Sequence, residues 1–99
     1  IGKLIPFDFE QITVDDTAGG KSLTALKVSS TPRPKKVIIT IETAQLRYMI
    51  DGATTVTSSV GNLANPMDAI VLEGYSQINN FRTIRVGGTS ATISCTYFR

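Results

Sequence analysis

The sequence contains no histidine, no tryptophan and a single cysteine among its 99 residues. Without histidine the chain lacks the commonest general base and the commonest metal ligand in proteins. One cysteine, Cys95, excludes an intrachain disulfide, and a zinc site would need a cluster of Cys and His ligands. We therefore expect the protein not to be an enzyme, with no catalytic residue, no cofactor and no metal site.

The sequence also has little excess of positive over negative charge. Ten Lys and Arg residues stand against eight Asp and Glu residues, which gives a formal net charge of +2. The charges are scattered and do not make the basic face by which proteins bind nucleic acid, so we expect no nucleic acid partner. No apolar run approaches the ~20 residues of a membrane span, so we expect no membrane partner.

Aromatic side chains are few, with four Phe and three Tyr. Surfaces that bind sugars or stack bases rely on exposed aromatic platforms. Tyr48 and Tyr97 lie in alternating runs, where a strand residue is expected to face the core or its margin. The aromatic pattern thus disfavours such a platform.

What the sequence has throughout is alternation of apolar and polar residues, rich in Thr, Val and Ile, with turn residues about every 8–12 positions. This pattern predicts one all-β domain over residues 1–99. The expected fold is an antiparallel β-sandwich, immunoglobulin-like or jelly-roll-like, of about seven or eight short strands. The strands are predicted at residues 6–14, 21–28, 37–43, 46–50, 69–73, 81–86 and 91–98.

The sequence pattern does not decide the conformation of two segments. Residues 54–60 are polar and β-branched, and they suit either an edge strand or an extended loop. Residues 74–80 are compatible with one short helical turn before the strand at 81–86.

The alternation also predicts which side chains face the core. Phe7 and Phe9 are expected on one face of the first strand, and Leu26 and Val28 point inward from the second. In the last strand four residues share the inward face, which predicts a buried and unreactive thiol. These residues are Ala91, Ile93, Cys95 and Tyr97.

Two glycine dipeptides predict two-residue hairpin turns. Asp51-Gly52 ends an alternating run, and Gly87-Gly88 separates two such runs. We expect a positive φ at Gly52. Asp15-Asp16 predicts a solvated turn with side-chain-to-backbone hydrogen bonds rather than a calcium site, since calcium needs about five further oxygen ligands.

Arg47 lies between Leu46 and Tyr48, on the opposite face of the predicted strand. We expect its guanidinium to pair with a carboxylate on a neighbouring strand, such as Glu42 or Glu73. A cross-strand pair of this kind contributes about 0.2–1 kcal/mol and needs no active-site role.

The second half of the chain, residues 46–99, carries a series of turn and strand motifs. The series begins with a strand that contains an Arg-aromatic pair and runs into an Asp-Gly turn. It continues with Gly-x-Leu and then with a strand that ends in Glu-Gly. It closes with Phe-Arg-x-Ile-Arg and a last strand that ends in Tyr and a further aromatic residue. The matching residues are Arg47, Tyr48, Asp51, Gly52, Gly61, Leu63, Asp68, Glu73, Gly74, Phe81, Arg82, Ile84, Arg85 and Tyr97.

This half resembles a group of small β-rich structural proteins encoded by tailed bacteriophages. The Asp-Gly turn is also similar to one in immunoglobulin-like modules appended to some glycosidases, but Thr55-Val56 stands where that group has Pro-Thr.

The phage resemblance implies a virion protein without enzymatic activity. The implied role is a decoration or cement protein that binds the major capsid protein on the capsid surface, after synthesis in the host cytoplasm. A homo-oligomer is expected, with a trimer as the state that fits local three-fold axes. Two alternatives stay open: a tail or head-to-tail connector subunit, and a carbohydrate-binding β-sandwich module.

Two segments are candidates for partner contacts, because loops and chain ends are free of core packing. The first is an apolar group near the start of the sequence, whose alternative role is an ordinary first strand. The second is a short basic run, whose alternative role is a solvated loop. The candidate residues are Leu4, Ile5, Phe7, Phe9, Arg33, Lys35 and Lys36.

Overall fold

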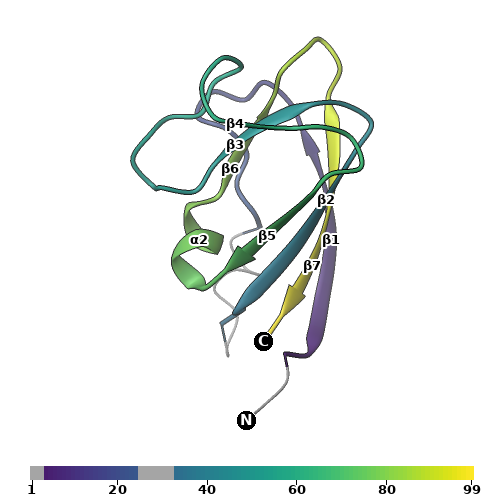
Figure 1. Ribbon diagram of the computed structural model, residues 1–99, viewed down its shortest axis with the longest axis vertical. Helices are drawn as coiled ribbons and strands as arrows, with labels where there is room; N and C mark the ends of the chain where they lie inside the picture. Colours follow the sequence, from purple (N-terminus) through teal and green to yellow (C-terminus); the bar gives the residue numbers. More distant parts are fainter. Residues whose placement is uncertain (1–3, 25–32) are drawn as a thin grey trace.

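The protein is described by a computed structural model that covers residues 4–24 and 33–99. Two antiparallel sheets pack against each other as an all-β sandwich, which confirms the predicted fold class (Figure 1). A single short helix lies beside the sheets in the part of the chain that is described. The elements are β1 (Pro6–Val14), β2 (Lys36–Glu42), β3 (Leu46–Met49), β4 (Asn62–Ala64), β5 (Ala69–Glu73), α2 (Tyr75–Asn80), β6 (Arg82–Arg85) and β7 (Ala91–Phe98).

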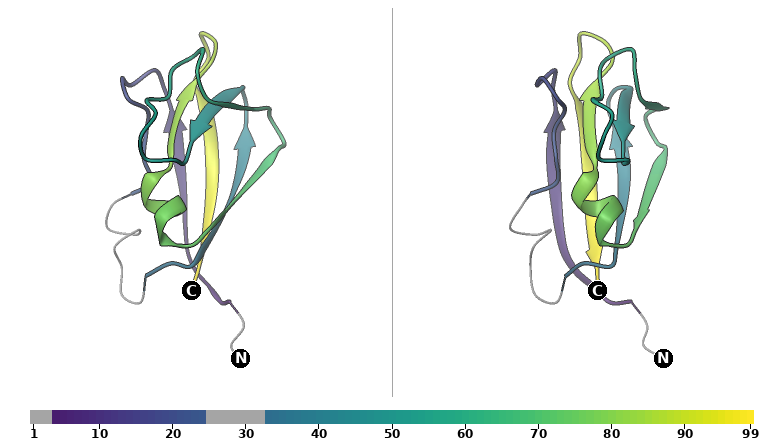
Figure 2. Two further views of the ribbon diagram at one scale, coloured as in Figure 1. Left: turned by 60° about the vertical axis from the view of Figure 1, so that its left-hand side comes forward. Right: turned by 90° about the vertical axis from the view of Figure 1, so that its left-hand side faces the viewer.

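The first sheet has the strand order β1-β7-β2-β5, and the second has the order β4-β3-β6. We call them the four-stranded and the three-stranded sheet. The last strand of the chain, β7, lies inside the four-stranded sheet and pairs with the first strand on one side and with β2 on the other. Figure 2 shows the two layers from the side. The strands at residues 69–73 and 91–98 have the predicted bounds.

The core lies between the two sheets and follows the alternation of β7. Ala91, Ile93, Cys95 and Tyr97 all have an exposed fraction of 0%, as predicted. Val37, Ile39 and Ile41 of β2 stand beside them and are equally buried. Because successive side chains of a strand point to opposite faces, every second residue of these strands faces the core.

Phe7 and Phe9 do not share a face of β1, so that prediction is wrong. The pairing of β1 with β7 shifts register between Pro6 and Asp8, as in a β-bulge. Phe7 packs on the core, with its ring centroid 6.3 Å from that of Tyr97, whereas Phe9 pairs with Thr96 on the water side. One extra residue in a strand reverses the alternation that follows it.

The strand predicted at residues 21–28 is wrong in its described part. Lys21 makes a single bridge to Thr83 of β6, and residues 22–24 belong to no strand. Leu23 is nevertheless buried and joins the core. Leu26 and Val28, which were expected to face inward, lie outside the described residues.

The hairpin predicted at Gly87-Gly88 is also wrong. The Gly87-Gly88 dipeptide lies between β6 and β7, but these strands belong to different sheets and do not pair with each other. Neither glycine has the positive φ that the tight turns of two-residue hairpins require. The dipeptide therefore belongs to a loop that crosses from one layer of the sandwich to the other.

Asp51-Gly52 forms a turn but not a two-residue hairpin. Gly52 has φ 74°, which confirms the predicted positive value. The Asp51 carboxylate accepts hydrogen bonds from the backbone N–H groups of Ala53 and Thr54, both at 3.0 Å. The chain then continues through a long loop, residues 50–61, before the short strand β4, which sequence alternation did not predict.

The structure also decides the conformation of the two segments that the sequence left open. Residues 54–60 are part of this loop rather than an edge strand, and α2 confirms the helical turn expected within residues 74–80. Asp15 accepts a hydrogen bond from the backbone N–H of Thr17 at 3.0 Å, which confirms the side-chain-stabilised turn.

Of the helices in the described residues, none has the length and apolar character needed to cross a membrane.

We expect Gly52→Val to destabilise the protein by about 1–3 kcal/mol, because a β-branched residue is strained at positive φ. A Cβ at this position would also lie 2.8 Å from the Asn80 side chain. Gly88→Val is the matched control, since a Cβ there meets nothing within 4 Å. Urea unfolding monitored by circular dichroism measures both variants, and equal midpoints would contradict the strained turn.

Candidate functional site

The described residues offer no metal centre. Within residues 4–24 and 33–99, no group of three or more Cys, Asp or Glu side chains is placed to hold a metal ion, and the sequence has no His. The thiol of Cys95 is fully buried. Burial raises the pKa of this thiol to about 12, and the nearby charge of Glu10 adds to the effect. Because the thiolate is the reactive form, burial and the raised pKa both disfavour reaction of Cys95 at neutral pH.

The start of β1 and the end of β7 lie at the same end of the sandwich (Figure 1). The backbone N–H of Ile5 donates to the carbonyl of Arg99, and the N–H of Arg99 donates to the carbonyl of Ile5, both at 3.1 Å. This pair extends the contact of β1 and β7 beyond the strands. It fixes the backbone beside Leu4 and Ile5, whose side chains are 43% and 64% exposed.

Phe7 lies between two other side chains at this end. The Arg99 guanidinium carbon is 4.0 Å from its ring centroid, and the Tyr97 ring packs on it from the core. A guanidinium over an aromatic face is an attractive cation–π arrangement. Of the predicted apolar contact residues, Phe7 is thus part of the core margin, while Leu4 and Ile5 face solvent.

The basic run lies next to the same end of β7. The backbone N–H of Lys35 donates to the carbonyl of Phe98 at 2.8 Å, and the N–H of Gly74 donates to the carbonyl of Lys35 at 2.8 Å. Lys36 then opens β2, directly opposite Phe98. The Arg33 guanidinium lies 4.3 Å from the ring centroid of Tyr75 on α2.

The fold therefore brings two predicted contact segments together, although about thirty positions separate them in the sequence. Phe98 has Pro6 opposite it on one side and Lys36 on the other. We call the resulting set of side chains the terminal surface, which consists of Leu4, Ile5, Arg33, Lys35 and Lys36. The structure does not bring Phe9 to it, because Phe9 stands on the outer face of the four-stranded sheet.

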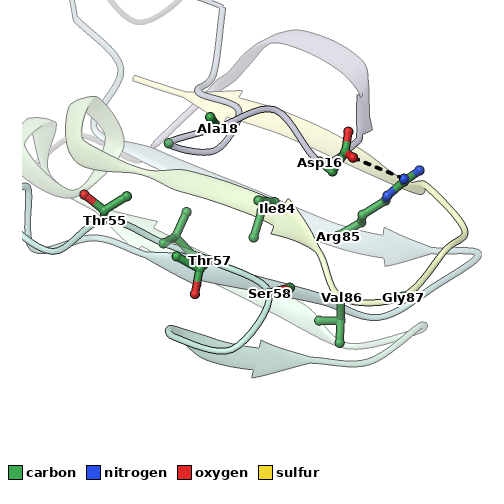
Figure 3. Close-up of a pocket in the computed structure, with 11 residues that line it drawn as sticks. Asp16, Ala18, Thr55, Thr57, Ser58, Ile84, Arg85, Val86 and Gly87 are labelled. Atoms are coloured by element: carbon green, nitrogen blue, oxygen red, sulfur yellow. Dashed lines mark ion pairs between the residues drawn. The ribbon is translucent and has the colours of Figure 1, made fainter.

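A pocket of about 480 Å³ opens toward the other end of the sandwich (Figure 3). Its walls come from the turn after β1, from residues 55–58 and from β6 with the loop that follows it. Asp16 and Arg85 form an ion pair of 3.4 Å at its side, and Arg85 also donates to the Ser90 hydroxyl at 3.2 Å. The pocket lining includes the buried apolar residues Val56 and Ile84.

Arg47 holds one wall of this pocket and does not pair with Glu42 or Glu73, so that expectation is wrong. Its Nε donates to the carbonyl of Ser58 at 3.0 Å, and its Nη1 donates to the carbonyl of Gly61 at 2.9 Å. The side chain thereby fixes the long loop on β3. Backbone carbonyls are present at every position, so the sequence carried no signal for these acceptors.

Sequence reasoning also missed the pocket, because its lining residues come from three loops and one strand. Arg85 was noted only within the Phe-Arg-x-Ile-Arg motif, and Asp16 only within a turn. Nothing in their spacing along the chain indicates that the two side chains meet.

Comparisons of the chain with protein-family models, with curated proteins and with solved structures found no match. We therefore infer function from the geometry of these surfaces and from the sequence resemblance.

We expect Cys95 to resist a thiol-reactive probe in the native protein and to react once the chain is unfolded, because its thiol is buried and protonated. The matched control is Cys95→Ser/Thr96→Cys, which moves the thiol to the outward side of the same strand. Labelling followed by mass spectrometry at mildly alkaline pH compares the two. Similar native-state rates would contradict the buried assignment.

Proposed function

We propose that the protein is a structural component of a tailed bacteriophage virion, a decoration or cement protein that binds the capsid shell through its terminal surface. The observation that carries the proposal is that the end of β7 holds two segments at one end of a small sandwich: the exposed apolar residues Leu4 and Ile5 on one side, and Lys35 and Lys36 on the other. The resemblance of residues 46–99 to phage structural proteins supports the same role.

The terminal surface combines two kinds of contact that a shell protein needs. Burial of an exposed Leu or Ile side chain contributes about 1.5–3 kcal/mol, so two such residues give only modest affinity at one site. Lysine side chains beside them favour an acidic surface and speed the encounter with it. Many copies on a repeating shell turn modest single-site affinity into stable decoration.

The surface is also held in place before it binds. Backbone hydrogen bonds fix both of its segments, since Ile5 pairs with Arg99 and Lys35 bonds to Phe98 and Gly74. A partner then meets a backbone that is already ordered, so that binding costs less conformational entropy.

The proposed partner is the major capsid protein, and the proposed location is the capsid surface. A homo-oligomer, with a trimer on the local three-fold axes, fits the symmetry of such a shell. A tail or head-to-tail connector subunit is the nearest alternative, and it would use the same end of the sandwich against a different virion subunit.

The pocket favours a second candidate function, a carbohydrate-binding module. Charged groups of Asp16 and Arg85 and the hydroxyl-bearing residues 55, 57 and 58 lie around apolar side chains. A few polar groups over an apolar floor are typical of small-molecule sites. Binding of defined glycans on an array, lost in Arg85→Ala, would favour this function over the virion role.

We expect Leu4→Ser/Ile5→Ser to lower capsid occupancy at least about tenfold, which corresponds to ~1.4 kcal/mol of lost contact free energy. Leu63→Ser is the matched control, because Leu63 is an apolar side chain of similar exposure on the three-stranded sheet. The measurement is co-sedimentation with undecorated capsids of the phage that encodes the chain, with thermal unfolding of each variant as a check on folding.

Two results would contradict the proposal. Equal capsid occupancy of the double variant and the Leu63 control would show that Leu4 and Ile5 of the terminal surface do not contribute to capsid binding. Absence of the intact protein from purified virions would overturn the virion role itself.

A further inference from the structure

Two opposite charges stand next to each other at the side of the pocket. The nearest atoms of the Arg85 guanidinium and the Asp16 carboxylate are 3.4 Å apart, which is longer than the ~2.8 Å of a charge-assisted hydrogen bond. The side chain of Asp16 is 76% exposed and that of Arg85 is 26% exposed. The pair is therefore a loose one, and it leaves a hydrogen-bond acceptor beside a hydrogen-bond donor within reach of a ligand.

The backbone holds this acceptor and donor side by side. The N–H of Arg85 on β6 donates to the carbonyl of Asp15 at 3.0 Å, one residue before Asp16. The Arg85 guanidinium is oriented further by the Ser90 hydroxyl, to which it donates at 3.2 Å. A ligand thus meets two polar groups whose relative position is set before it binds, which lowers the entropic cost of binding.

A vicinal diol, two hydroxyls on adjacent carbons, is complementary to an acceptor beside a donor. Because a hydroxyl both donates and accepts, one can donate to the Asp16 carboxylate while its neighbour accepts from the Arg85 guanidinium. An anion would lie against Asp16, and a cation would lie against Arg85, so each of these meets a like charge. The pair therefore favours a neutral ligand that carries neighbouring hydroxyls.

The opposite side of the pocket offers further hydroxyls. Figure 3 shows the Asp16–Arg85 pair on one side of Ile84 and Thr57 on the other. The Thr57 hydroxyl accepts from the backbone N–H groups of Ser59 at 3.2 Å and Val60 at 2.9 Å, so its own hydrogen is left to donate. A ligand that lies across Ile84 meets polar groups on both sides, as the ring of a hexose with its several hydroxyls requires.

The base of the pocket is aliphatic. Val56 and Ile84 are buried there, and half-buried Val86 lies beside them. None of the described residues that line the pocket carries an aromatic ring. A sugar that binds by stacking needs the flat face of such a ring. The apolar contact in this pocket must therefore come from an aliphatic group of the ligand.

We propose that the pocket binds a 6-deoxyhexose, with two neighbouring hydroxyls on Asp16 and Arg85 and its methyl group against Ile84 and Val86. Other hexoses carry a hydroxymethyl group in place of that methyl, and its hydroxyl would find no hydrogen-bond partner among aliphatic side chains. An acetamide methyl fits less well, because the N–H and C=O beside it also need partners there.

This inference rests on the carbohydrate-binding function, the second candidate above, and names its ligand. It does not depend on the capsid. The pocket opens toward the end of the sandwich away from the terminal surface, so binding through Leu4 and Ile5 leaves it free.

The test uses pairs of sugars that differ by a single oxygen. L-Fucose is compared with L-galactose, and L-rhamnose with L-mannose, in titrations of the full chain followed by the NMR shifts of backbone amides. In at least one pair we expect the 6-deoxy sugar to bind at least about tenfold more tightly. The largest shifts are expected at residues 16 and 84–86. L-Leucine, whose ammonium and carboxylate offer both charges together, is the competing probe.

Two variants separate the diol contact from the methyl contact. Asp16→Ala is expected to weaken both sugars of the pair by a similar factor, at least about fivefold, and Glu73→Ala on β5 is its control. Val86→Thr places a hydroxyl at the base and is expected to reduce the preference for the 6-deoxy sugar to less than about threefold. Val71→Thr is the same exchange outside the pocket and is expected to keep the full preference. Thermal unfolding shows which variants keep the fold.

The outcomes distinguish this inference from the function on which it rests. Glycans that bind in the pocket with no preference for the 6-deoxy member of either pair would overturn the inference alone. Tighter binding of L-leucine than of any of the sugars, or an unchanged preference in folded Val86→Thr, would do the same. No binding of the four sugars together with a negative glycan array would overturn the carbohydrate-binding function as well. The wild-type comparison needs no variant, so it decides even if Val86→Thr does not fold.

Discussion

Strict alternation in β7 is the constraint on which the rest of the fold depends. This strand pairs along its whole length with β1 and over most of it with β2, and its inward side chains are completely buried. A slip of one residue would move Ile93 and Tyr97 from the core to water, so the register of the sheet is firmly specified. Because β2 in turn pairs with β5, the same strand indirectly positions all four strands of the larger sheet.

The terminal surface is a consequence of that register. Once the inward residues of β7 are placed, Phe98 must lie between Pro6 and Lys36, and this brings the start of the chain next to the basic segment. The outward position of Phe9 arises in the same way, since Phe9 stands opposite the outward residue Thr96. The bulge near Phe7 matters here, because it turns Phe9 outward and leaves Phe7 on the core.

The opposite end of the sandwich is organised by hydrogen bonds rather than by alternation. Arg47 fixes the loop of residues 50–61 through two backbone carbonyls, and Asp51 caps the turn where that loop begins. These hydrogen bonds hold the pKa of the Asp51 carboxyl below its usual range, chiefly through Thr54. The pocket beside Arg85 therefore has walls that are anchored to strands, although most of its residues lie in loops.

The sequence by itself determined what depends on neighbouring residues. It predicted the sandwich, the bounds of β1, β5 and β7, the burial of Cys95 and the positive φ of Gly52, because alternation and turn chemistry act over a few positions. Only the tertiary structure decided which strands pair. It placed the strands on either side of Gly87-Gly88 in different sheets, gave Arg47 carbonyl acceptors in place of a carboxylate, and joined Ile5 to the basic segment through β7. Pairing between strands depends on hydrogen bonds and packing across long sequence separations, and local patterns carry no record of those partners.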